Sequence, residues 1–576
     1  MKRIRKAIIA IITGMLLLIS SVTMAFAAEG ISGLEDVAAF GSGVLTDINK
    51  VLKTDLTVKA NEKAGLAGDV TVMLDIESAA GILYLPGTAD TSKLRLSWDD
   101  KELIVSKGNK EYSSGKAPIA ADGKKAKYTL SKDGFKASLT VKTIKGSSKV
   151  KPMFIDVDET KGSIKAMNSD KNHDTECYGS VKYKKISKKI KIKGRGNTTW
   201  ELPKKPYSVT FYKKDYSDKK KAELIDGVKT KKWYLLANYL DSSMMRNKIA
   251  LDLADNLGIG LKSEFVDVWM NGSYCGNYQL TPKKDIDCPD EGYIIENDHL
   301  EDSESRDQFK IKNMKEIPGT DKYINILEIG EIAEQQGVTA KSIKSYMDKA
   351  WAAVLDMDSD DYQNYFDMDS WAKQYLMLEV SKTYSCFAGN LIMHRNGTSK
   401  KDKLIAGPAW DYDIAFGRTL HKPQVAVSEP MQLNAEGWYN DSVGYMYERE
   451  PVTLLQGLGM HKSFMKHVAK VYNDYKWAFE DLDNNVEVQR SILRKSVQMN
   501  NTKLDAYPIS TDFVIAPNTM KTLGTGKYKL DYKVTLTWDD YVDNLKEYCN
   551  KRVLWMSDHM APGVTIQTYH GGTVQT

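Results

Sequence analysis

The sequence contains few cysteines and lacks the short motifs of common metal, redox and hydrolase sites. Five cysteines among 576 residues are odd in number and widely spaced, and no CxxC pair occurs. We therefore expect neither a zinc site nor thioredoxin chemistry nor a disulfide-based fold. Cys275 and Cys288 are the nearest pair along the chain, and they fit a disulfide or two buried thiols. HExxH, GxSxG and Walker P-loop motifs are absent too.

After its first residues the chain has no run of about 20 apolar residues, the length that a membrane span needs. The start has three parts: four basic residues among the first six, the apolar run 7–19, and small residues at 25–28. This layout predicts a signal peptide over residues 1–28 and a secreted, extracellular protein, in the medium or at the cell wall. Removing it lowers the formal net charge from +5 by four to +1. Nucleic-acid binding through bulk charge is therefore not expected.

The length of the chain predicts several domains, because one core does not grow this large. Residues 29–150 alternate polar and apolar positions in short runs, for example over 70–74 and 137–141. Turn signals such as Asp122-Gly123 and Asp133-Gly134 separate the runs. This pattern predicts a small all-β module, an Ig-like antiparallel sandwich. It contains no candidate site, so we expect a spacer or a surface-binding module.

The rest of the chain predicts an α+β fold, with strands first and helices later. Strand-like runs lie at 153–157, 189–193 and 207–211, and Asn271-Gly272 indicates a hairpin turn. Asp241 or Ser242 caps a helix that ends before Gly258. After about residue 338 helical spacing dominates, over 343–355, 371–382, 462–501 and 538–560. We expect a core domain over 151–430 and a helical C-terminal part over 431–576.

Five segments occur in the order of a known family. They are 193–200 with 204–207, 233–238 with Asp241 and 246–247, 268–281, 292–296, and 407–417. Each is weak alone, but together over about residues 150–420 they resemble the CotH family of secreted, atypical kinases. The resemblance implies a two-lobed fold like that of protein kinases. It also implies phosphate transfer from ATP to Ser or Thr of an extracellular or cell-surface protein, with Mg²⁺ or Mn²⁺.

The resemblance assigns a metal site to the segment Trp410-Asp411-Tyr412-Asp413. Asp411 and Asp413 follow the apolar run 404–406 and are two residues apart, so both carboxylates can face one side. Asn390 matches a family asparagine and is the expected second ligand. The alternative is a pair of capping or salt-bridged aspartates in a structural turn.

Nucleotide binding is expected from a second group of residues, namely Arg195, Asn197, Lys204, Lys205 and Glu296. Glycines beside Arg195 would let its guanidinium and the backbone approach phosphate closely. The alternative is a tight turn with a surface arginine. One of the two lysines would reach the phosphates, and the sequence does not indicate which.

Two positions depart from the family pattern. Ser385 stands where the family has an aspartate, and a serine hydroxyl cannot accept a proton as a carboxylate can. Pro282 stands where the family tends to have a glutamate. Glu379 is the candidate substitute for the missing base. These departures keep a second hypothesis open: a degenerate kinase that acts as a non-catalytic cell-surface binding or assembly protein.

Overall fold

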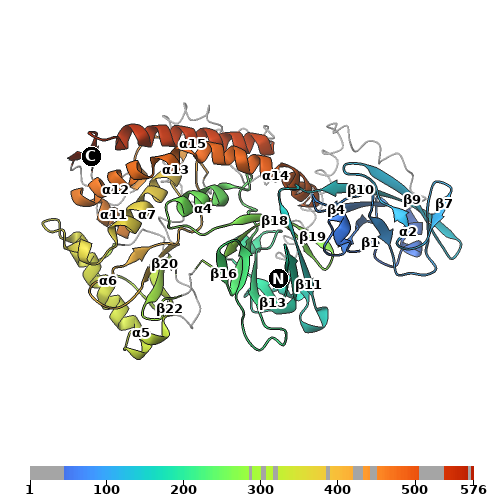
Figure 1. Ribbon diagram of the computed structural model, residues 1–576, viewed down its shortest axis with the longest axis horizontal. Helices are drawn as coiled ribbons and strands as arrows, with labels where there is room; N and C mark the ends of the chain where they lie inside the picture. Colours follow the sequence, from blue (N-terminus) through green and yellow to red (C-terminus); the bar gives the residue numbers. More distant parts are fainter. Residues whose placement is uncertain are drawn as a thin grey trace, which may run out of the picture. The chain divides into compact units, whose positions relative to one another are not determined.

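The computed structural model describes residues 45–196, 198–284, 288–299, 307–315, 322–383, 390–418, 433–440, 451–504, 537–567 and 573–575 (Figure 1). The expected signal segment 1–28 lies outside these ranges. The chain forms two compact units. The first comprises the chain up to Lys59 with Thr71–Leu83 and Thr91–Thr143, and the second comprises Ala60–Val70, Tyr84–Asp90 and Ile144–Thr576. The architecture is α+β, as the sequence predicts.

The N-terminal part is built from short strands in two sheets, of order β2-β1-β5-β8 and β3-β4-β10-β9-β6-β7. The elements are α2 (Leu45–Val51), β1 (Thr57–Val58), β2 (Val70–Thr71), β3 (Met73–Asp75), β4 (Ala80–Leu85), β5 (Arg95–Ser97), β6 (Ile104–Lys107), β7 (Lys110–Tyr112), β8 (Ala117–Pro118), β9 (Lys125–Lys132) and β10 (Phe135–Lys145). The predicted Asp133-Gly134 turn joins β9 and β10, with φ of 51° and 78° at its two residues. Both values suit the tight turn of a twisted hairpin.

Seven strands of the second unit form a closed barrel of order β11-β12-β13-β14-β17-β19-β18. They are β11 (Lys151–Val157), β12 (Glu176–Tyr183), β13 (Ile186–Gly194), β14 (Tyr207–Phe211), β17 (Lys232–Leu236), β18 (Glu264–Met270) and β19 (Ser273–Pro282). Apolar residues such as Ile190, Ile192 and Val209 are buried in the core of this barrel. The predicted Asn271-Gly272 turn joins β18 and β19. Closure leaves this sheet without open edges.

A five-stranded sheet of order β21-β22-β20-β23-β24 follows the barrel in sequence. Its strands are β20 (Tyr293–His299), β21 (Gln308–Phe309), β22 (Lys322–Ile329), β23 (Leu391–Arg395) and β24 (Ile405–Ala406). Helices α4 (Arg246–Asn256), α6 (Ala340–Leu355), α7 (Met368–Ser381), α11 (Leu454–Gly459) and α12 (Lys462–Asp474) share a large apolar core with it.

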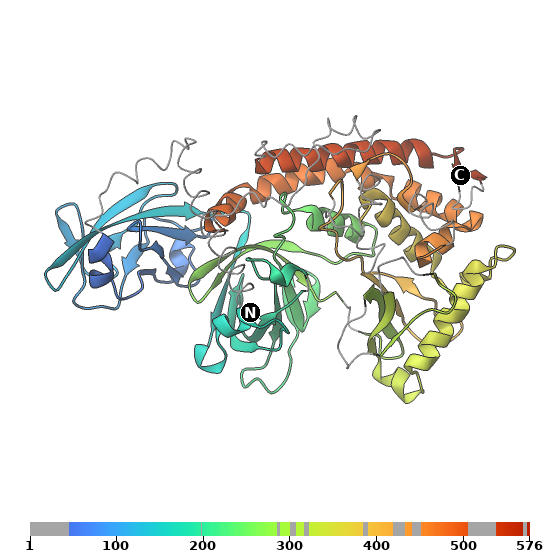
Figure 2. The ribbon, with the colours of Figure 1, turned by 180° about the vertical axis from the view of Figure 1, so that it is seen from behind.

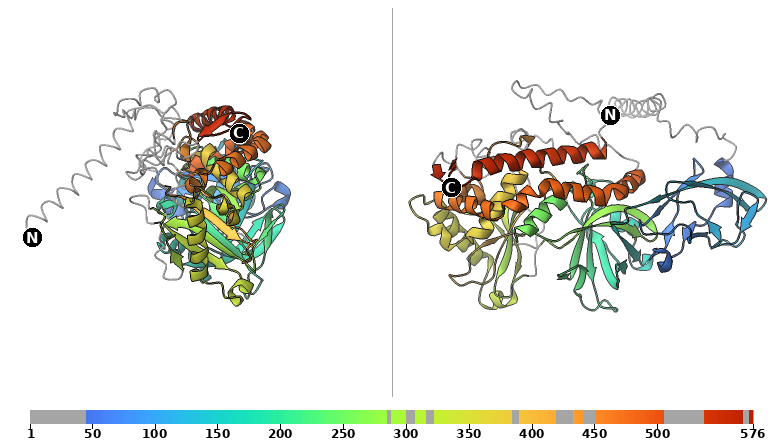
Figure 3. Two further views of the ribbon diagram at one scale, coloured as in Figure 1. Left: turned by 90° about the vertical axis from the view of Figure 1, so that its left-hand side faces the viewer. Right: turned by 45° about the horizontal axis from the view of Figure 1, so that its top comes forward.

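Two long helices complete this unit, α14 (Leu482–Leu504) and α15 (Trp538–Met560), and α15 has the predicted bounds. They run side by side, orange and red in Figures 2 and 3, and Arg494 on α14 forms a two-pronged ion pair with Asp539 on α15 at 2.7 and 2.9 Å. Among the described residues, no helix has the length and apolarity to cross a membrane.

A buried ion pair ties α15 to α7. Arg552 donates to a carboxylate oxygen of Glu379 at 3.0 Å, and both side chains are fully buried. The two oxygens of Glu379 also accept from the backbone N–H groups of Tyr439 and Asn440, at 2.8 and 2.9 Å. Within the described residues, every contact of this carboxylate is internal. Glu379, expected as a substitute base, is thus placed as an anchor of the helical core.

We predict that Arg552→Met lowers the free energy of unfolding by about 3–5 kcal/mol, because it leaves the Glu379 carboxylate buried without its cation. Urea denaturation followed by circular dichroism measures the change. Arg494→Ala is the matched control: its side chain is 48% exposed, so losing its ion pair should change the free energy by less than about 1 kcal/mol. Equal effects of the two substitutions would contradict the assignment of Glu379 as an anchor.

Candidate functional site

The loop after β24 carries the two predicted metal-binding aspartates, and neighbouring elements hold it firmly. Asp411 has a φ of 66°, a left-handed backbone conformation that L-residues adopt at a cost of about 1–2 kcal/mol. The next residue, Tyr412, donates its N–H to the side-chain oxygen of Asn247 at 2.7 Å. Arg246 donates to the carbonyl of Ala415 at 3.0 Å. The start of α4 therefore fixes the loop that presents the carboxylates.

Asn390, expected from the family resemblance as a second metal ligand, lies beside Asp411. It precedes β23, and its Nδ2 donates to Oδ2 of Asp411 at 3.1 Å. Arg418 donates from its own side chain to the carbonyl of Asp413 at 2.9 Å. Three predicted ligands thus come from two segments, the start of β23 and the loop after β24.

The surroundings of Asp411 and Asp413 disfavour the charged forms of both carboxylates. Burial, and then the like charge of Asp413, raise the pKa of Asp411 well above its usual range, while Arg195 and Lys284 oppose the shift. Burial also raises the pKa of Asp413, and Arg418 opposes it. Asp298 on β20 adds a further negative charge near Asp411. Carboxylates with pKa values perturbed in this way cluster at functional sites.

Arg195 reaches this site from the end of β13. Its guanidinium carbon lies 4.3 Å from the ring centre of Tyr234 and 5.9 Å from that of Trp410. Since Arg195 lowers the pKa of Asp411 electrostatically, it faces both the aromatic rings and the carboxylate. The side chain of Arg195 is therefore half-buried against aromatic rings and is not exposed in a turn. The neighbouring Asn197, also expected at the nucleotide, lies outside the described residues.

The two predicted lysines point elsewhere. Lys204 is buried and donates to the backbone carbonyls of Ala237, at 2.8 Å, and Asn277; burial lowers its pKa to about 7. Lys205 donates to the carbonyl of Trp200 and lies over that indole ring, 5.0 Å from its centre. The described contacts of both ammonium groups are therefore contacts within the barrel and its adjoining loop.

Sequence reasoning missed the lysine that does approach the carboxylates. Lys284 follows β19 and contacts the two carboxylate oxygens of Glu296 at 2.5 and 2.7 Å. Glu296, predicted at the nucleotide, is fully buried on β20. Lys284 is also one of the two cations that act on Asp411. Its position two residues after Pro282, at the end of a predicted hairpin strand, was the available signal.

Of the two positions that depart from the family pattern, the structure describes Pro282 and not Ser385. Ser385 lies outside the described residues, as does Cys386. Pro282 ends β19 and pairs with Trp233 of β17. The question about Cys275 and Cys288 is answered: both are free thiols in the structure.

The donor set fits one hard divalent cation, although it is small. In the described part of the chain, no group of three or more His, Cys, Asp and Glu side chains is placed to hold a metal ion. Two carboxylates and one amide are present instead, and Mg²⁺ commonly takes one or two carboxylates and completes its shell with water and phosphate oxygens. A cation would also relieve the repulsion that raises the pKa of Asp411.

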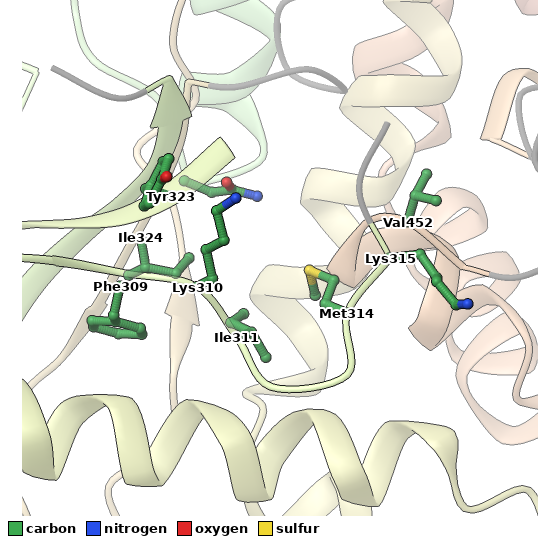
Figure 4. Close-up of a pocket in the computed structure, with 9 residues that line it drawn as sticks. Phe309, Lys310, Ile311, Met314, Lys315, Tyr323, Ile324 and Val452 are labelled. Carbon is green, nitrogen blue, oxygen red and sulfur yellow. The ribbon is translucent and has the colours of Figure 1, made fainter. Parts of the chain in front are cut away.

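A separate pocket lies near β20 and contains none of the predicted site residues (Figure 4). Its lining is mainly apolar, with two lysines: Asn297, Phe309, Lys310, Ile311, Met314, Lys315, Tyr323, Ile324 and Val452. It has no carboxylate, so it does not offer the chemistry of the Asp411 site.

Comparisons with known proteins agree with the motifs. A family model described as CotH kinase protein matches residues 192–556, more than half of the chain. Inner spore coat protein H of Bacillus subtilis (strain 168) is 25% identical to the chain over 244 residues. That match covers 41% of this chain and 61% of the relative, so the chain spans less than two thirds of that protein's length.

We predict that Asp411→Asn stabilises the protein at pH 7 in the presence of EDTA. The folded-state pKa of Asp411 is raised, so ionising it in the folded protein opposes folding at any pH above its ordinary value of 3.8. The gain in thermal midpoint should grow as the pH rises and disappear below about pH 4, where both states are protonated. Differential scanning calorimetry across this range measures it. Asp474→Asn, which changes an exposed carboxylate on α12, is the control. An equal gain in thermal midpoint for this variant would contradict the prediction.

Proposed function

Because the chain belongs to the CotH kinase family, we propose that it transfers phosphate from ATP to Ser or Thr hydroxyls of an extracellular or cell-surface protein. One observation carries this proposal: the pair of half-buried Asp411 and buried Asp413, with Asn390 bonded to Asp411 and with Arg195 and Lys284 as the cations that act on it. Family membership favours this function over the non-catalytic alternative.

Phosphoryl transfer requires chiefly that reactants be positioned and phosphate charge be neutralised. We assign Asp411, Asp413 and Asn390 to a divalent cation, Mg²⁺ or Mn²⁺. When bound, such an ion neutralises charge on the phosphate oxygens. Lys284, oriented by Glu296, and Arg195 would hold the phosphates from the other side. Four of these six residues were expected for the same roles from the sequence, and Glu296 was expected at the nucleotide.

The acceptor proton needs no dedicated carboxylate in this proposal. All described contacts of Glu379 are internal, so we leave it out of the chemistry. Transition states of phosphoryl transfer are usually loose, with little bond formation to the acceptor. Losing a base at Ser385 therefore slows the reaction without abolishing it.

The finer architecture and location are part of the same proposal. The barrel would form one lobe of a kinase-like domain, and the five-stranded sheet with its helices would form the other. Residues 29–150 would be the Ig-like module, 151–430 the kinase core and 431–576 its helical continuation. The signal segment 1–28 would direct export, and the name of the similar spore coat protein is consistent with a surface location.

We predict that the purified mature protein, incubated with Mg²⁺ and γ-labelled ATP, labels itself or a co-secreted protein. Asp411→Ala should reduce the rate at least about a hundredfold, because it removes a group that neutralises phosphate charge through the metal. Labelling is quantified by autoradiography after electrophoresis, and omitting Mg²⁺ is the parallel control. Equal labelling by the variant would refute the metal assignment, and absence of both nucleotide binding and transfer in the wild type would refute the kinase function.

We predict that Lys284→Met lowers kcat/KM by about ten- to a hundredfold, whereas Lys205→Met lowers it less than about threefold. Lys284 acts on Asp411 and pairs with Glu296, while Lys205 contacts Trp200. Losing one charge-assisted contact to phosphate accounts for the larger effect. Initial rates against ATP concentration measure both variants. A larger loss for Lys205→Met than for Lys284→Met would instead favour Lys205, one of the two lysines that the sequence suggested.

A further inference from the structure

The outer face of the barrel carries a row of polar residues beside the candidate site. Lys193 on β13 pairs with Ser208 on β14, and Ser208 pairs with Tyr234 on β17. One row further along, Lys191 pairs with Thr210, and Thr210 pairs with Lys232. Residues two apart on a strand point to the same side, so both rows share the face that Arg195 covers at Tyr234.

Positive charge accumulates on this face. The Nζ of Lys232 lies 6.0 Å from the ring centre of Tyr234, the ring that Arg195 also covers. Burial, and then the charges of Lys193, Lys219 and Arg195, lower the pKa of Lys232 to about 8, while Glu176 opposes them. A half-buried ammonium among like charges destabilises the folded protein unless an anion joins it.

The cations nearest to Arg195 are not used for internal pairing. Among the described residues, Lys193, Arg195 and Lys232 form no ion pair, whereas Lys191 on the same face pairs with Glu176 at 3.3 Å. The hydroxyl oxygen of Ser208 is buried between Lys193 and Tyr234 and has no hydrogen-bond partner within the described structure; this residue is 3% exposed. Buried hydroxyls are normally hydrogen-bonded, so an unpaired one at the floor of a cationic cluster indicates a ligand.

We propose that Lys193, Arg195 and Lys232, with the Ser208 hydroxyl at the floor, bind a phosphate group. This site rests on the proposed function and extends it: Arg195 acts on both Asp411 and Lys232, so it would join the new site to the carboxylate pair. The ligand is a phosphate ester or polyphosphate, from the nucleotide or from a phosphorylated residue of the acceptor.

Pyrophosphate binding to the full mature chain in EDTA tests the site without the metal. We expect calorimetric titration to show binding that weakens with added salt, and Lys232→Met and Lys193→Met each to weaken it at least tenfold. Lys191→Met, on the same face but paired with Glu176, is the matched control and should change the affinity less than about threefold. Lys232→Met should also raise the thermal midpoint, which shows that the variant folds.

Two further experiments distinguish the possible sources of the phosphate and separate this site from the proposed kinase function. If the nucleotide supplies the phosphate, both lysine variants raise the Kd for ATP with Mg²⁺. If the acceptor supplies it, they raise KM only for a peptide that carries phosphoserine beside its target hydroxyl. Asp411→Asn should keep pyrophosphate binding in EDTA even when it abolishes transfer, so a failed kinase function leaves this site standing. Wild-type protein that does not bind pyrophosphate, or lysine variants that bind it as well as Lys191→Met does, would overturn the site.

Discussion

Two carboxylates held two residues apart in one loop set the requirements for the rest of the candidate site. Burial raises the pKa values of both Asp411 and Asp413, and the like charge of Asp413 raises that of Asp411 further, so the folded protein keeps them together at a cost in free energy. The loop does not relax because it is fixed from outside, by Asn247 at the N–H of Tyr412 and by Arg246 at the carbonyl of Ala415. Strain of this kind persists only where the surrounding structure overdetermines it.

The charged side chains in and around the core differ in how completely they are paired. Asp241 with Arg246, at 2.6 Å, and Glu379 with Arg552 are complete pairs with further hydrogen bonds to backbone or hydroxyl groups. Such pairs fix geometry, since removing either partner leaves a buried charge. Arg195, in contrast, faces aromatic rings and a carboxylate that it does not contact as an ion pair in the described structure. In the proposed function, a triphosphate with its cation would complete this charge balance.

Much of the fold follows from local sequence pattern, and so does the carboxylate pair. Helical spacing gave the bounds of α15, and Asn271-Gly272 gave a hairpin, because both signals are local. Asn390 was placed by its resemblance to the family pattern. The sequence could not decide between Lys204 and Lys205 for a tertiary reason: the carbonyls of Ala237 and Asn277, which hold Lys204, come from distant segments. The anchoring of Glu379 likewise depends on Arg552, 173 residues further along the chain.

The Lys284–Glu296 pair shows that a departure at one motif position does not by itself decide which charges lie around the Asp411 loop. Pro282 removes a carboxylate from the end of β19, yet the lysine two residues later finds its acidic partner on β20 instead. Because Glu296 is fully buried, its charge is costly without a cation, and Lys284 is held in return. The side chain of Lys284 needs a carboxylate partner to orient it toward Asp411. Any strand that brings a carboxylate within reach can orient it. The charge around the loop therefore depends on which carboxylate the fold brings to Lys284 rather than on the residue type at a single position of the hairpin.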